Sequence, residues 1–147
     1  MVSLFNSEDQ NQYIMIYIYF TILVAITVWG IVFHFKHTRV YTEDLGHPGV
    51  LSLGTFNGFG ETLLGGFTTN EGGSVYYVMF TILFLPVCPI KCIVASYKGY
   101  DPFIIGGTSK YEVFHKTSSN WKEVLSIFAI RWGLAFLLVT TFILFNL

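Results

Sequence analysis

The sequence predicts a helical membrane protein with two transmembrane helices, over about residues 13–35 and 121–145, and a small β module between them. Its 147 residues are 53% hydrophobic and only 12% charged, which is typical of membrane proteins and not of soluble domains. Two apolar segments are each long enough to cross a hydrocarbon core of about 30 Å, which needs about 20 helical residues. Seven of the eight Lys and Arg residues lie in the centre of the chain, between Phe33 and Val124. We therefore expect residues 1–147 to form a single membrane domain.

The first predicted helix is a retained anchor. Residues 13–33 contain no charged side chain, and the flank before them carries Glu8 and Asp9, where a cleaved signal peptide would need basic residues. Basic loops stay on the cytoplasmic side of a membrane. The central region should therefore be cytoplasmic, and both termini should be extracytoplasmic.

The central region, residues 36–120, is rich in glycine and is predicted to form a small β module in the cytoplasm. Twelve of the fourteen glycines lie there. Four of its segments are short, rich in β-branched and aromatic residues, and bounded by turn residues. These predicted strands cover residues 50–56, 61–67, 91–97 and 111–117. We expect the last two to pair through a connection that is too long for a tight hairpin.

An apolar segment within this region, residues 74–90, predicts a short helix. Only the run 75–85 is free of helix breakers, because Pro86 and Pro89 follow it. Such a run reaches about 17 Å, roughly half of the hydrocarbon thickness. Basic residues also flank the segment on both sides, so a full crossing would place one basic loop outside. We predict a re-entrant or interfacial helix over about residues 74–86; the alternative is a third transmembrane helix.

The last helix has a recognisable start and one small-residue face. Asn120 precedes Glu123 by three residues, the spacing of a capping box. Further along, Ala129 and Gly133 are four residues apart, which places two small side chains on one face and lets another helix approach closely. That other helix could belong to a partner or be the first span of the same chain.

The last helix also carries one charge within its apolar stretch. Arg131 lies about 13 Å along the helix from its expected start, and a charge at that depth in a membrane needs a partner. Pro86 and Pro89 lack N–H groups and would leave carbonyls unpaired at the end of the predicted short helix. We predict that Arg131 binds carbonyls between Thr81 and Cys88. The alternative is that its side chain extends back to lipid phosphate.

The sequence predicts no catalytic, cofactor-binding or metal site. The pair Cys88 and Cys92 has a gap of three residues and no second pair, unlike common zinc sites. The glycines at residues 58 and 60 lack the further glycine and the Lys-Ser/Thr that a phosphate-binding loop requires. Acidic and basic residues balance in the centre, which argues against nucleic-acid binding. We therefore expect a protein that is not an enzyme and holds no cofactor.

Three short motifs carry a resemblance to known sequences. They are GFGETLLG at residues 58–65, GS at residues 73–74 and LPVCPI at residues 85–90. Together they resemble a group of small, uncharacterised bacterial membrane proteins with a GxGxxLxG, GS and LPxxPI core. The resemblance covers about 40 residues, implies a similar architecture in the bacterial inner (cytoplasmic) membrane, and implies no activity.

Two function classes follow from these observations. The first is a non-catalytic accessory or scaffold subunit, which contacts other integral membrane subunits and the lipid bilayer through its apolar helices. The second is a small homo-oligomeric channel or transporter component lined by the re-entrant segment, since broken helices occur at membrane depth where protein or water covers them.

Overall fold

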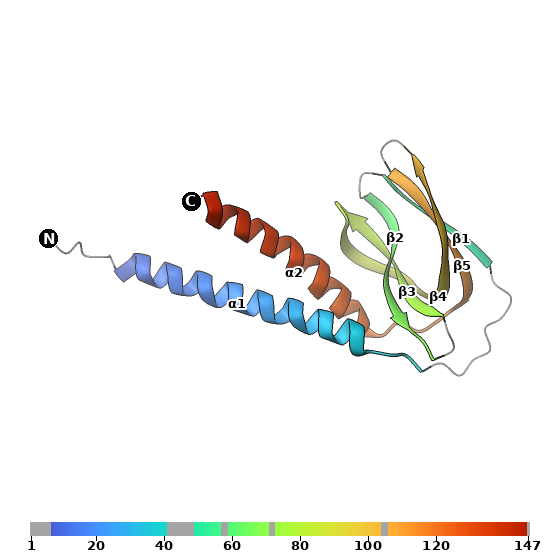
Figure 1. Ribbon diagram of the computed structural model, residues 1–147, viewed down its shortest axis with the longest axis horizontal. Helices are drawn as coiled ribbons and strands as arrows, with labels where there is room; N and C mark the ends of the chain where they lie inside the picture. The colour runs from blue at the N-terminus through green and yellow to red at the C-terminus, as the bar shows by residue number, and fades with distance from the viewer. Residues whose placement is uncertain (1–6, 41–48, 57–58, 71–72, 104–105, 147) are drawn as a thin grey trace.

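The computed structural model describes residues 7–40, 49–56, 59–70, 73–103 and 106–146. Within them, the chain forms a long helix, then five antiparallel strands, then a second long helix (Figure 1). The helices are α1 (Ser7–Lys36) and α2 (Trp121–Asn146). The strands are β1 (Gly49–Phe56), β2 (Phe59–Thr68), β3 (Ser74–Ile82), β4 (Leu85–Phe103) and β5 (Gly106–Lys116).

The strands form a closed barrel in which consecutive strands are neighbours. β1 closes the barrel by pairing with β5 along its whole length, from Gly49↔Val113 to Phe56↔Gly106. β4 is 19 residues long and pairs with two strands. Its first part pairs with β3, and β5 joins it from Ile93 onward. Among the described residues, no strand therefore lies beside the outer edge of β4 before Ile93.

The two helices lie side by side and project from one side of the barrel (Figure 1). Their approach is close because small residues meet. A Cβ added at Gly30 would lie 3.0 Å from the Cβ of Ala129, and one added at Gly133 would lie 3.0 Å from the Cβ of Thr27. The face predicted from Ala129 and Gly133 thus packs on α1 of the same chain.

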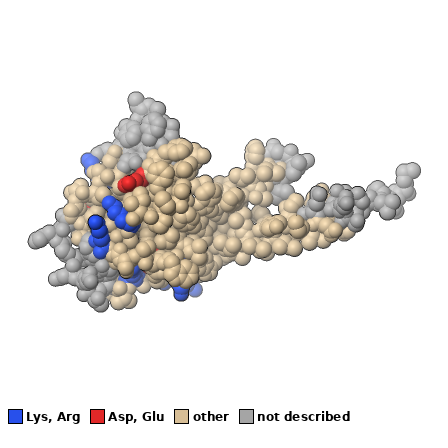
Figure 2. Space-filling view, turned by 180° about the vertical axis from the view of Figure 1, so that it is seen from behind, with Lys and Arg blue, Asp and Glu red and all other residues tan. Residues whose placement is uncertain are grey.

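Both helices are long and apolar enough to cross a membrane, over Tyr13–Lys36 and Trp121–Ile143. Only 11% and 17% of their apolar windows are buried inside the protein. A core helix of a soluble protein would bury most of that surface, so this exposure fits a membrane environment. In Figure 2 the Lys and Arg side chains gather at the barrel end of the molecule, and the helices show an uncharged surface.

The middle parts of β2, β3 and β4 are buried on both faces. One cluster fills the barrel interior and includes Leu63, Val78 and Ile93. A second cluster lies on the outer face, where Tyr77 and Met79 are completely buried and Ile127 of α2 packs against them. The outer face of this sheet is therefore where the barrel meets the helices.

The four predicted strands are confirmed within β1, β2, β4 and β5, and the expected pairing of residues 91–97 with 111–117 is present. The expected long connection between these two strands is wrong, because both strands continue until Phe103 pairs with Gly106. The predicted short helix over residues 74–86 is wrong, and so is the alternative of a third transmembrane helix in this segment. This segment forms β3, a two-residue turn and the start of β4. A strand buried on both faces has a continuous apolar sequence, which periodicity cannot distinguish from a short buried helix.

Candidate functional site: a buried polar junction

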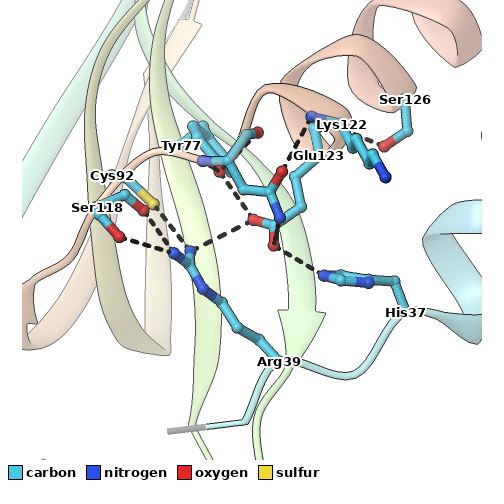
Figure 3. A network of polar contacts seen from close by, with 9 residues as sticks. His37, Arg39, Tyr77, Cys92, Ser118, Lys122, Glu123 and Ser126 are labelled. Atoms are coloured by element: carbon cyan, nitrogen blue, oxygen red, sulfur yellow. Dashed lines mark hydrogen bonds and ion pairs between the residues drawn. The ribbon is translucent and has the colours of Figure 1, made fainter.

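A cluster of polar side chains lies where the barrel meets the two helices, and we call it the junction (Figure 3). Its members come from the end of α1 and the segment after it, from β3 and β4, and from the start of α2. They are His37, Arg39, Tyr77, Cys92, Ser118, Asn120 and Glu123.

Glu123 is the centre of the junction, and its side chain is completely buried. It stands in the first turn of α2, where the helix dipole stabilises a negative charge. Its Oε1 accepts a hydrogen bond from His37 Nε2 at 2.9 Å. Its Oε2 accepts one from the Tyr77 hydroxyl at 2.8 Å and a longer one from Arg39 Nη1 at 3.4 Å. Because an ionised carboxylate only accepts, the Nε2 atom of His37 carries the hydrogen.

The predicted helix start is confirmed, and Tyr77 modifies its capping box. Asn120 Oδ1 accepts a hydrogen bond from the Lys122 amide at 3.0 Å, as an N-cap residue does. In a simple capping box the Asn120 amide would donate to Glu123. Here it donates to the Tyr77 hydroxyl at 2.8 Å, and that hydroxyl donates to the carboxylate. A strand of the barrel thus forms part of the cap of α2.

Arg39 links three parts of the chain. Its Nη2 donates to the carbonyl of Ser118 at 2.6 Å, just before α2, and its Nη1 lies 3.8 Å from Cys92 Sγ on β4. Its backbone amide donates to the Thr68 carbonyl at the end of β2 at 3.0 Å. The segment that leaves α1 is therefore held to the barrel by its backbone and to α2 by its side chain.

Burial keeps the Tyr77 hydroxyl and the Cys92 thiol neutral. It raises the pKa of the Tyr77 hydroxyl, and the hydrogen bond to Glu123 acts in the same direction. Burial likewise raises the pKa of the Cys92 thiol. Both groups remain protonated at neutral pH, so Tyr77 can donate to the carboxylate.

The geometry suits a mechanical role. Glu123 is inaccessible to solvent, and both of its oxygens are occupied by donors from the same chain. Removing one member of a buried ion pair leaves an uncompensated charge, so such a pair strongly favours one arrangement. The junction therefore fixes the orientation of the barrel relative to the helices.

Arg131 does not make its predicted contact. The Pro86 carbonyl accepts a hydrogen bond from Trp132 Nε1 at 2.9 Å, so the neighbouring residue takes the place assigned to the arginine. Successive residues point about 100° apart around a helix, so the two side chains face different surroundings. Arg131 lines a hollow of about 240 Å³ together with His34 and Leu64.

The other predicted residues lie at contacts between elements. Pro89 pairs with Met79 at the start of β4, and it lines a surface hollow beside Trp121 of α2. Ala129 and Gly133 pack on α1, as described above. None of the five predicted residues belongs to the junction.

Of the junction residues, only Asn120 and Glu123 were predicted from the sequence to lie at a common site, the start of the last helix. One signal was available. Antiparallel helices place the end of the first beside the start of the second, so His37 and Arg39 could have been paired with Glu123. Tyr77 gave no such signal, because its strand was predicted as a helix.

Within the described residues, no three His, Cys, Asp or Glu side chains are grouped so that they could hold a metal ion. Comparison of the chain with known protein families, with curated proteins and with solved structures finds no match.

Proposed function

We propose that the protein is a non-catalytic accessory or scaffold subunit of a larger membrane complex, in which two transmembrane helices hold the barrel at the membrane surface. The bacterial inner membrane is the proposed location, from the resemblance of its motifs. The barrel is proposed to be cytoplasmic because most of the basic residues lie between the helices.

One surface carries this proposal. An apolar hollow of about 600 Å³ runs between α1 and α2 beside the small-residue contact, and its lining includes Ile26, Trp29 and Phe136. Its lining is almost entirely apolar, and the Ile26, Trp29 and Phe136 side chains are 48%, 42% and 51% exposed. A helix of another integral membrane subunit would fill it by close packing. The junction supports the role, because it holds the barrel in a fixed position relative to that surface.

Purification in a mild detergent tests the proposal. The tagged chain should co-purify with a defined set of integral membrane proteins. Ile26→Trp should block the hollow and remove those partners, whereas Val28→Trp changes an equally exposed residue outside it and should retain them. Recovery of the chain without partners, or equal loss in both variants, would contradict the proposal.

The channel alternative required a half-membrane helix over residues 74–86, and β3 occupies that segment. A closed homo-oligomer with measurable ion conductance, isolated in the same purification, would favour it over the accessory role.

A further inference from the structure

The turn between β3 and β4 has an unusual composition for its backbone conformation. Leu83 and Phe84 have φ values of 51° and 65°, in the left-handed region. Two-residue hairpin turns of this kind normally carry Asn and Gly, because a large side chain there is strained. Leu83 and Phe84 are nevertheless 63% and 64% exposed, so nothing in the described chain packs over them.

The strands that lead to this turn are also apolar on their exposed side. Phe80 and Ile82 at the end of β3, and Val87 and Ile90 at the start of β4, are all exposed. No charged residue occurs between residues 72 and 90. A hairpin that faces water would carry polar residues on this surface, so the hairpin tip is suited to an apolar medium.

The tip lies beside the apolar part of α2, and the exposed Glu61 of β2 lies opposite Phe80 at its base. The hydrogen bond from Trp132 Nε1 to the Pro86 carbonyl, 2.9 Å long, fixes its position. Trp132 is eleven residues beyond the start of α2, which is about 16 Å along the helix axis. Figure 1 shows the β3–β4 end of the barrel leaning along α2. If α2 enters a membrane, the hairpin tip therefore reaches the same leaflet.

The backbone of this hairpin is adapted to a place without water. Unpaired N–H and C=O groups are costly in hydrocarbon, and the first part of β4 has an edge that β5 does not cover. Two of its residues, Pro86 and Pro89, have no N–H to leave unpaired. The Pro86 carbonyl accepts its hydrogen bond from Trp132, and α2 lies along the same edge.

We propose that the tip of the β3–β4 hairpin, residues 80–90, inserts into the lipid acyl chains of the leaflet that α2 enters, as a third membrane contact beside the two helices. This inference rests on the proposed membrane insertion of α2 and adds a lipid-binding element that the accessory role does not require. The turn keeps its strained conformation because the two large side chains gain a hydrocarbon environment.

Depth-dependent fluorescence quenching tests the inference on the full chain. In a Cys88→Ser background, Phe84→Cys is labelled with an environment-sensitive thiol dye, and the protein is placed in phosphatidylcholine and phosphatidylglycerol vesicles. We expect blue-shifted emission that a nitroxide on the acyl chain quenches several-fold more strongly than aqueous iodide does. Val87→Cys, at a site 46% exposed next to the turn, gives an independent reading if the turn variant fails to fold.

Two further labelled sites separate the possible failures. Val50→Cys lies on β1 at a site 83% exposed, and iodide alone should quench it. Val139→Cys lies far along α2 at a site 55% exposed, and the acyl-chain quencher should reach it. Lipid quenching at Val139 but not at either hairpin site would overturn the hairpin inference and leave the helices in the membrane. A hairpin label shielded from both quenchers would overturn it in favour of contact with another copy of the chain. Absence of lipid quenching at Val139 as well would overturn the proposed insertion of α2 itself.

Discussion

Glu123 links the two parts of the molecule through one carboxylate. Its donors arrive from the end of α1 and from β3, and its own backbone belongs to α2. A buried carboxylate without these donors would be very costly, so the barrel and the helices must be in place together. The ion pair between Lys98 and Glu112 is shorter, at 2.7 Å against 3.4 Å for Arg39 and Glu123, but it is more exposed and water screens it. These two pairs should therefore differ in their contribution to stability.

Substitution of each acid tests this difference. Glu123→Gln removes the counter-charge of Arg39, whose side chain is only 15% exposed, and should lower the free energy of unfolding by about 3 kcal/mol. Glu112→Gln should lower it by less than about 1 kcal/mol. Thermal unfolding of the two variants in the same detergent measures both effects. Equal Tm values for the two would show that the junction does not hold the barrel and the helices together.

The Tyr77 hydroxyl predicts a stability that falls at alkaline pH. Its pKa is raised in the folded protein above the ordinary value of 10.0, so its contribution is fully present below pH 10.0 and is lost as the pH rises beyond that value. Cys92 acts in the same direction from its ordinary value of 9.0. Tyr77→Phe should lose about 1 kcal/mol at neutral pH, through its lost hydrogen bonds, and should show a weaker decline above pH 10.

The comparison is made by recording Tm between pH 7 and pH 11. Tyr97→Phe is the matched control, because Tyr97 is 54% exposed and makes no contact in the junction. Its curve should follow that of the unsubstituted protein. An identical decline for Tyr77→Phe would show that other groups govern the alkaline loss.

At the level of elements, the sequence was sufficient where local signals were unambiguous. Strands β1, β2 and β5 follow from β-branched and aromatic residues between turn residues, and α2 follows from its cap at Asn120. β3 could not be predicted in this way. Val75, Tyr77 and Met79 face the helices and Val78 faces the barrel interior, so its apolar residues do not alternate with polar ones. The junction includes Tyr77 of β3. Because this segment was predicted as a helix, the contact between Tyr77 and Glu123 could not be predicted.

The contact between α1 and α2 gives a prediction at this scale. Gly133→Leu should be destabilising, because its added Cβ would meet Thr27 on α1. Overpacking of this kind typically costs about 1–3 kcal/mol, which exceeds the gain of about 0.8 kcal/mol in helix propensity. Thr141→Leu, at an exposed position later in α2, introduces the same side chain without that contact and serves as the control. A Tm for Gly133→Leu at or above that of the control would mean that the helices can separate at this point without loss.

The whole molecule has a polar end and an apolar end. The Lys and Arg side chains gather at the barrel end (Figure 2), and both helices extend away from the barrel in the same general direction (Figure 1). This arrangement follows from two antiparallel helices that leave the barrel at the same junction. It predicts that both ends of the chain lie on the side of the membrane opposite the barrel, and the basic residues of the centre predict that the barrel side is cytoplasmic.

Sidedness in intact cells tests this topology. Epitope tags at the two termini should both be accessible from outside the cell membrane. A cysteine at Ser119, which is exposed beside the start of α2, should react with a membrane-impermeant thiol reagent only after permeabilisation, in a background of Cys88→Ser. Buried Cys92 provides little competing reaction in the folded protein. Accessibility of only one terminus would require an odd number of crossings and contradict the two-helix arrangement. If both termini were protected and residue 119 were labelled from outside, the protein would have two membrane crossings in the opposite orientation. The basic residues would then not set the orientation.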